Sequence, residues 1–263
     1  MAFDESLGFF DDVPESDWIR QKEISKQKVH VGPIEDLVLA RHIYQNVWES
    51  DFSCRHDVMV GPMRDGHKWV CDPHRLERIH NERKKETGEG CLIYSIGCNG
   101  IFTFEEAILK IAPFCEIVLI DPIDYSARIP TAIRDRVTYH THALDASDPK
   151  LQLKTFENIS ILLPDPMEKN GHTGCTVDIF KIDCEGCEWM VYHDFAKADL
   201  RQIQIEVHSW LPESPAFFQA MYDYGYAIFH KESNTNGCSG NCLEYGFIKL
   251  DKSYQTLASK SLA

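Results

Sequence analysis

Carboxylates and a histidine follow two apolar segments of the chain, at the points where predicted strands end. Asp183 and Glu185 come directly after the apolar run 177–182, and Gly186 follows them. Glu206 and His208 stand at the end of the apolar run 203–207. Because alternate residues of an extended chain point to the same side, Glu206 and His208 share one face. We expect these four side chains to gather around one pocket.

These residue types are suited to moving a proton or holding a cation. His208 is the natural general base, because the unperturbed pKa of histidine lies near neutrality. Alternatively, Asp183 and its neighbours hold a divalent cation that lowers the pKa of a bound hydroxyl. One carboxylate could instead bind an amino group, and Glu206 could serve as a structural hydrogen-bonding group. We assign no metal-ligating residue from the sequence.

Short apolar segments that alternate with helical segments must position these residues. Strands are predicted over residues 92–96, 116–120, 137–140, 177–182, 203–207, 226–230 and 243–250. Helices are predicted to start near Pro73, at Thr103 with Glu106 in a capping box, at Ser147, after Gly186 and at Ser214. This order is typical of a Rossmann-like α/β fold: a doubly wound, mostly parallel seven-stranded sheet with an antiparallel C-terminal hairpin. Ligands of such sheets bind at the carboxyl ends of the strands.

The chain before residue 89 lacks this alternation. Residues 1–30 are mostly polar and predict a loosely held arm, and residues 51–73 predict irregular structure with turns. Apolar residues between Ile34 and Trp48 recur at helical spacing and predict a helix that packs on the rest of the chain. We therefore predict an N-terminal tail and helical extension over 1–88, a Rossmann-like domain over 89–254, and a C-terminal tail over 255–263.

The loop after the first predicted strand has a sparse glycine pattern. Gly97-Cys98-Asn99-Gly100 reads G-x-x-G, without the third glycine of the dinucleotide fingerprint G-x-G-x-x-G. A cofactor that has no pyrophosphate needs fewer glycines, so the pattern favours S-adenosylmethionine over NAD. We predict that Ser95, Gly97, Asn99 and Gly100 contact this cofactor.

Residues after the next two predicted strands extend the cofactor site. Asp121 ends the second strand about twenty residues after the glycines, where a carboxylate can accept hydrogen bonds from both ribose hydroxyls. Capping of the following turn is the alternative role for Asp121. His142, Ala143 and Leu144 follow the third strand, where the adenine would rest, and ordinary core packing is the alternative for each. Asn234 and Glu244, in the predicted final hairpin, could face the pocket and bind an acceptor.

Several of these segments resemble the FkbM-type and related methyltransferase-like families. They are residues 91–97, the turn 171–173, residues 178–186, residues 204–208 and the upstream segment 65–73. The most specific is residues 181–189, which read KIDCEGCEW. The resemblance spans about residues 54–250. It implies class I S-adenosylmethionine binding and, by analogy with FkbM-type enzymes, O-methylation of a hydroxyl.

The composition of the chain excludes some classes of binding partner. The formal charge of −14 argues against a phosphate backbone as the main partner, because non-specific nucleic-acid affinity comes from clustered Lys and Arg. No segment reaches the roughly 18 consecutive apolar residues of a membrane span, and residues 1–12 do not read as a signal peptide. We therefore expect a cytoplasmic protein that acts on a neutral or cationic small molecule, without nucleic acid or membrane. The sequence does not define an oligomeric state.

The chain has ten cysteines. Several lie within predicted strands and helices, where we expect reduced, buried thiols: Cys91, Cys98, Cys115, Cys184 and Cys187. Cys54, His56, Cys71 and His74 could bind zinc, but a disulfide or plain packing is favoured there. The pair Cys238 and Cys242 could form a disulfide or bind a metal, and Cys184-x-x-Cys187 could be redox-active.

The sequence therefore predicts an S-adenosylmethionine-dependent methyltransferase that modifies a small molecule, with oxygen as the expected acceptor atom. The catalytic candidates are Asp183, Glu185, Glu206 and His208. A divalent cation could assist S-adenosylmethionine. The rival hypotheses are an NAD-dependent oxidoreductase and a catalytically inactive methyltransferase-like module that binds a partner.

Overall fold

The computed structural model describes residues 1–25, 48–63, 66–152, 158–208, 214–235, 238, 242–251 and 254. The tail 255–263 lies outside the described residues. So does the helix predicted from Ile34 onward, except for its last residue, Trp48. Within the described residues, no helix combines the length and apolar composition that crossing a bilayer requires.

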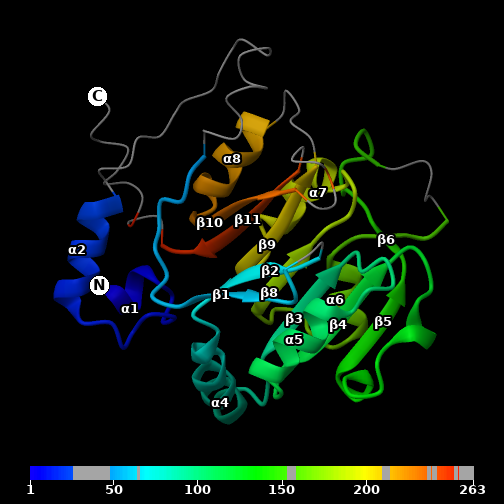
Figure 1. Cartoon of the computed structure of the whole chain (residues 1–263), viewed down its shortest axis with the longest axis horizontal. Coiled ribbons are helices and arrows are strands. Elements are labelled where there is room, and N and C mark those ends of the chain that lie inside the picture. The colour runs from blue at the N-terminus through cyan, green and yellow to red at the C-terminus, as the bar shows by residue number, and fades with distance from the viewer. Residues whose placement is uncertain are drawn as a thin grey trace.

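A seven-stranded sheet forms the centre of the protein, in the order β10-β11-β9-β8-β3-β4-β5 (Figure 1). Its strands are β3 (Leu92–Ile96), β4 (Glu116–Asp121), β5 (Val137–Thr141), β8 (Val177–Ile182), β9 (Leu200–His208), β10 (Tyr226–Asn234) and β11 (Cys242–Lys249). Neighbouring strands from β9 to β5 pair in parallel, whereas β11 is antiparallel to both β9 and β10. The predicted Rossmann-like α/β fold is confirmed, including its antiparallel C-terminal hairpin.

Helices and short strands surround this sheet. The helices are α1 (Ala2–Glu5), α2 (Glu15–Ser25), α4 (Leu76–Glu86), α5 (Thr103–Ile111), α6 (Pro164–Lys169), α7 (Glu188–Phe195) and α8 (Ser214–Asp223). Single 3-10 turns occur at Pro73–Arg75, Ser126–Arg128 and Arg134–Arg136. Two further strand pairs are the antiparallel hairpin β1 (Asp57–Val60) with β2 (Lys68–Cys71), and β6 (Ala143–Leu144) with β7 (Ser160–Ile161). The sequence did not predict the hairpin, because four-residue strands are too short to show a clear alternation.

The two faces of the sheet are covered differently. Helices α7 and α8 bury aromatic side chains such as Phe195 and Phe217 against Phe180 and Ile205 on one face. On the other face, α5 and the hairpin β1–β2 pack against apolar residues of β3, β4 and β8. This second face also carries a row of polar side chains beside the hairpin, and the candidate site lies there.

The predicted loose arm at residues 1–30 is wrong for the part that the structure describes. Phe9, Phe10 and Trp18 are buried in a separate aromatic core that contains Phe52 and Tyr254. Buried Glu5 accepts hydrogen bonds from the Trp18 indole and Lys22. The three aromatic residues outweigh the polarity of their neighbours, because burying each large ring contributes about 1.5–3 kcal/mol.

Two helix starts also differ from prediction. Helix α5 begins at Thr103, as expected, but no side chain caps it and the Thr103 hydroxyl is buried without a partner, so the capping box is wrong. Residues 147–151 form turns instead of a helix. There the Ser147 amide and hydroxyl both donate to Asp194 of α7, which ties the segment to a neighbouring helix.

Four disulfides occur in the described residues, and the two within predicted strands and helices, Cys91–Cys115 and Cys184–Cys187, correct the prediction of reduced thiols. The four bonds join Cys54 to Cys71, Cys91 to Cys115, Cys184 to Cys187, and Cys238 to Cys242. Cys98 and Cys175 are free and buried, so the prediction holds for Cys98. The Cys91–Cys115 bond is explained by the pairing of β3 with β4, which places the residues before Leu92 and Glu116 side by side.

We expect peptide mapping under non-reducing conditions to find these four pairs. Alkylation of the denatured, unreduced protein should then label only Cys98 and Cys175. Replacing both Cys91 and Cys115 by alanine should lower the free energy of unfolding by about 3 kcal/mol, because the unfolded chain gains loop entropy. Alkylation of all ten cysteines without reductant would contradict the pairing.

Candidate active site

Acidic side chains from four strands meet at the carboxyl edge of the sheet. Asp183 follows β8, and Glu206 lies in the last part of β9. In the paired strands, Glu206 stands opposite Glu244 of β11, and Glu244 stands opposite Glu232 of β10. Residues that are directly opposite in neighbouring strands share a face. The structure thus brings Asp183 and Glu206 together as predicted, places Glu244 of the predicted hairpin beside them, and adds Glu232 to the row.

Lys68 of β2 supplies the cation for this row. Its Nζ lies 2.8 Å from Glu244 Oε1, 3.2 Å from Asp183 Oδ2 and 3.9 Å from Glu206 Oε2. The side chain is only 1 % exposed. We call Lys68, Asp183, Glu206 and Glu244 the buried ion cluster. The sequence does not indicate a role for Lys68, because its partners lie more than a hundred positions away along the chain.

The buried ion cluster shifts the pKa values of its members in opposite directions. Burial alone would lower the pKa of Lys68, but Glu244, Asp183 and Glu206 outweigh it and raise this pKa. Burial would raise the pKa of Asp183, yet Lys68, Lys181 and His208 lower it below its usual range. Burial and the charges of Asp183 and Glu244 raise the pKa of Glu206 to about 8. Ionisation is therefore favoured at Asp183 more than at Glu206.

His208 is held in one orientation by Glu188. Glu188 Oε1 accepts hydrogen bonds from the His208 backbone amide at 2.7 Å and from the ring Nδ1 at 3.1 Å. Burial lowers the pKa of His208, but the hydrogen bond and charge of Glu188 outweigh this and raise it to about 9. The ring nitrogen Nε2 faces Glu185 Oε2 at 3.4 Å, Asp183 Oδ1 at 3.8 Å and Glu206 Oε1 at 4.0 Å. The role of Glu188 was not predicted from the sequence, although this residue lies in the specific segment 181–189.

The turn from Asp183 to Glu188 has an unusual backbone. Glu185 has φ of 57° and Gly186 has φ of 106°, both in the left-handed region that non-glycine residues rarely adopt. The disulfide between Cys184 and Cys187 closes the turn, and the Gly186 amide donates to Glu188 Oε2 at 3.0 Å. Strained residues of this kind cluster at functional sites. The turn presents Asp183 and Glu185 toward His208.

The predicted cofactor loop packs directly against this turn. Gly97 has φ of 77°, and a Cβ added there would lie 1.8 Å from the carbonyl oxygen of Asp183. Asn99 and Gly100 also adopt positive φ, at 48° and 70°. Lys181 donates to the carbonyl oxygen of Gly97. Only glycine fits at position 97, because the backbones of two loops approach each other there.

Asp121 holds the cofactor loop in place. Its Oδ2 accepts hydrogen bonds from the amides of Cys98 and Asn99 at 2.8 and 3.0 Å, and its Oδ1 accepts one from the Ile123 amide at 2.9 Å. The residue is 4 % exposed. Asp121 therefore lies beside the loop, as the sequence indicated, and also caps its own turn, which was the alternative.

The remaining predicted cofactor residues lie around β3 and β5. Ser95 is fully buried, and its hydroxyl donates to Glu105 Oε1 of α5 at 2.6 Å. Ala143 and Leu144 are buried in β6, and Leu144 belongs to the apolar core. His142 precedes them and is partly exposed. Asn234 lies at the other side of the site, where its Nδ2 donates to Glu206 Oε1 at 2.9 Å.

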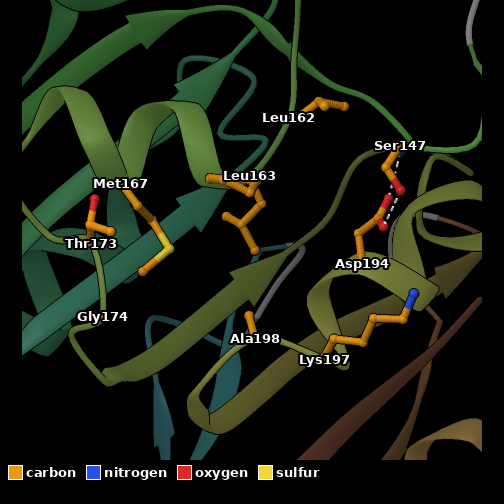
Figure 2. Close-up of a pocket in the computed structure, with 10 residues that line it drawn as sticks. Ser147, Leu162, Leu163, Met167, Thr173, Gly174, Asp194, Lys197 and Ala198 are labelled. Atoms are coloured by element: carbon orange, nitrogen blue, oxygen red, sulfur yellow. Dashed lines mark hydrogen bonds between the residues drawn. The ribbon is translucent and has the colours of Figure 1, made fainter.

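A separate apolar pocket of about 390 Å³ lies beside α6 and α7 (Figure 2). Leu162, Leu163 and Met167 line one side, and Asp194, Lys197 and Ala198 line the other. None of the predicted site residues lines it. Its walls lie on the face covered by α6 and α7, so it is distinct from the buried ion cluster.

A sequence model of a family described as a methyltransferase domain matches residues 1–249. The chain belongs to this methyltransferase-domain family. The match includes the N-terminal helices and the hairpin β1–β2. Among curated proteins, none matches the chain.

Three solved structures show distant similarity. A fibrillarin pre-rRNA processing protein from Methanococcus jannaschii is 13% identical, with a TM-score of 0.40 over 62% of this chain and 67% of that one. The 1,6-didemethyltoxoflavin-N1-methyltransferase from Burkholderia thailandensis is 11% identical, with a TM-score of 0.39 over 68% and 80%. The N-methyltransferase NodS from Bradyrhizobium japonicum is 15% identical, with a TM-score of 0.33 over 68% and 97%.

Proposed function

We propose that the protein transfers the methyl group of S-adenosylmethionine to a hydroxyl oxygen of a small molecule. The observation that carries this proposal is the backbone contact between Gly97 and Asp183. A cofactor on the Gly97–Gly100 loop would present its methyl group beside the turn that holds Asp183 and Glu185. Membership of the methyltransferase-domain family supports the same reaction. The segment 181–189 further supports an FkbM-type enzyme.

The proposed reaction is an in-line displacement. The acceptor oxygen forms a bond to the methyl carbon while the carbon–sulfur bond breaks, and the sulfonium sulfur takes the electron pair to become a neutral thioether. The hydroxyl proton passes either to the neutral form of His208, which its raised pKa makes the minor form at neutral pH, or to water when a bound cation lowers the pKa of the hydroxyl. Orientation of the two reactants can supply roughly 7–11 kcal/mol of the barrier reduction. His208 as a base and a divalent cation bound near Asp183 are the two candidate activators of the hydroxyl.

The cofactor residues of this proposal are Ser95, Gly97, Asn99, Gly100, Asp121, His142, Ala143 and Leu144. Asn99 is exposed and Gly97 and Gly100 are partly exposed, so a cofactor can approach the loop at these positions. Asp121 stabilises that backbone and retains acceptor capacity on Oδ1 for a ribose hydroxyl. Its contribution to binding therefore includes both the shape of the loop and a direct contact.

Charge favours a neutral or cationic acceptor. Carboxylates outnumber Lys68 around the site, and the whole chain carries −14. An anionic acceptor such as a nucleic acid would be repelled. Four disulfides are typical of proteins in oxidising compartments, so they count against the predicted cytoplasmic location.

Calorimetric titration with S-adenosylmethionine and S-adenosylhomocysteine tests the cofactor assignment. We expect both to bind with micromolar affinity and NADH not to bind. Asp121→Ala should weaken binding at least tenfold, which is about 1.4 kcal/mol, because the Cys98 and Asn99 amides lose their acceptor. The matched control is Asp124→Ala, which removes an exposed carboxylate that bonds only within its own turn. Folded protein that binds neither compound would refute the enzyme proposal in favour of a binding module, whereas NADH binding would favour an oxidoreductase.

A further inference from the structure

We infer that Asp183, Glu185 and His208 bind one divalent first-row transition-metal ion, with Mn²⁺ or Zn²⁺ as the best fit. The role of this ion, activation of the acceptor hydroxyl, rests on the proposed methyl transfer. The binding of the ion does not, because it depends only on side chains of this chain. Of the two candidate activators of the hydroxyl, the bound cation is therefore favoured over His208 as a base.

The donor atoms already surround a common point. Glu185 Oε2 and Asp183 Oδ1 lie 3.4 and 3.8 Å from His208 Nε2, and the three donors lie within 4.8 Å of one another. Donors on one metal ion, each about 2.0–2.2 Å from it, are separated by roughly 3 Å. Small side-chain rotations bring the donors to that spacing. Glu185 is free to make the largest one, because its side chain is 83 % exposed.

The donor types indicate the class of ion. One imidazole nitrogen suits zinc or iron better than magnesium, and the two carboxylates suit hard divalent ions such as manganese. Three protein donors leave coordination positions open, as in catalytic rather than structural metal sites. An acceptor oxygen bound at an open position would have a lowered pKa and would lie beside the Gly97 loop.

Glu188 provides an independent observation that points to a metal. Histidine ligands commonly donate their second ring nitrogen to a carboxylate, which fixes the ring and its tautomer. Glu188 is 1 % exposed and accepts from His208 Nδ1, so Nε2 is left facing Asp183 and Glu185. A buried glutamate with this bond is well explained as the orienting partner of a metal-binding histidine.

Lys68 leaves room for the ion. It contacts Asp183 through Oδ2, whereas Oδ1 of the same carboxylate faces His208. Further carboxyl groups lie around His208 and Lys68, from Glu185, Glu188, Glu206 and Glu244. A divalent cation bound at Oδ1 would place positive charge among them.

A second set of donors competes for His208. Glu206, His208, Cys238 and Cys242 also lie within 4.8 Å of one another. The disulfide between Cys238 and Cys242 removes both thiolates from this set, and zinc binds cysteine as thiolate. In the oxidised protein the oxygen–nitrogen site is therefore favoured, and Mn²⁺ is the probe that discriminates between the two.

The test is a titration of the oxidised full-length protein with Mn²⁺, without cofactor or acceptor. Electron paramagnetic resonance measures the concentration of free Mn²⁺ at each step. We expect one ion per chain. His208→Gln and Glu185→Gln should weaken binding at least tenfold, and Glu188→Gln should weaken it 10–100-fold through loss of ring orientation. The matched control is His230→Gln, which changes a histidine on β10 that pairs with Asp57 and Glu232 instead. This variant should bind Mn²⁺ like the original protein.

The inference is overturned if the folded protein binds neither Mn²⁺ nor Zn²⁺, or if His208→Gln binds Mn²⁺ unchanged. It is also overturned if Cys238→Ser, rather than Glu185→Gln, abolishes binding. Glu185 is exposed, so its variant should fold even if replacement of a buried ligand does not. Titration of the same metal-free protein with S-adenosylhomocysteine separates the metal site from the proposed methyl transfer. A protein that binds S-adenosylhomocysteine but neither Mn²⁺ nor Zn²⁺ overturns only the metal site.

Discussion

Replacing Lys68 by methionine is expected to lower the free energy of unfolding by about 3–5 kcal/mol, the usual effect of removing one partner from a buried ion pair. Methionine preserves most of the side-chain volume but leaves Asp183, Glu206 and Glu244 without their cation. Their mutual repulsion inside the protein then opposes folding. Urea denaturation under non-reducing conditions measures the change.

Two further variants identify the cause of this loss. Lys231→Met removes a lysine whose side chain is 7 % exposed and whose partner Glu49 is 63 % exposed, and it should cost less than Lys68→Met because water can solvate the carboxylate that is left. Adding Glu244→Gln to Lys68→Met should restore at least about 1 kcal/mol, because one of the unpaired charges is gone. A Lys68→Met protein as stable as the original would show that the buried ion cluster does not need its cation.

Gly97→Ala is expected to destabilise the protein by about 3 kcal/mol or more and to abolish S-adenosylhomocysteine binding. The new methyl group would lie 1.8 Å from the Asp183 carbonyl oxygen, so the cofactor loop and the reaction turn must move apart. The φ of 77° adds the cost of a left-handed alanine, about 1–2 kcal/mol. Denaturation and calorimetry measure the two effects.

Gly171→Ala is the matched control for this variant. Gly171 has φ of 73°, but a Cβ there would meet nothing within 4 Å. Its replacement should therefore cost only the left-handed conformation, about 1–2 kcal/mol, and leave cofactor binding intact. Equal effects of the two substitutions would mean that the contact between Gly97 and Asp183 has no special importance.

The order of strands could be predicted because each central strand is a short apolar run. The predicted runs 92–96 and 177–182 coincide with β3 and β8. The paired cysteines could also have been found: Cys91 and Cys115 each precede one of two neighbouring parallel strands, which places them at the same edge of the sheet. Strand membership alone suggested isolated thiols, because it ignores which strands are neighbours.

The sequence could predict only those residues of the candidate site that lie at the end of a strand. Asp183, Glu206 and His208 meet that condition, and the structure places them together. Lys68 and Glu188 do not meet it. Lys68 reaches the site from a hairpin that is remote in sequence, and Glu188 acts from the first turn of α7 through His208. Such contacts depend on tertiary packing, which a pattern along the chain does not encode.

The source of Lys68 has a consequence for how this family can diverge. The cation comes from the hairpin β1–β2, whereas its carboxylate partners come from β8, β9 and β11. A lineage that lost the lysine alone would keep three buried acids in mutual repulsion, and one that lost the acids alone would bury an unpaired ammonium. The positions of Lys68 and Glu244 are therefore expected to co-vary among relatives, with both charges present or both replaced by neutral residues.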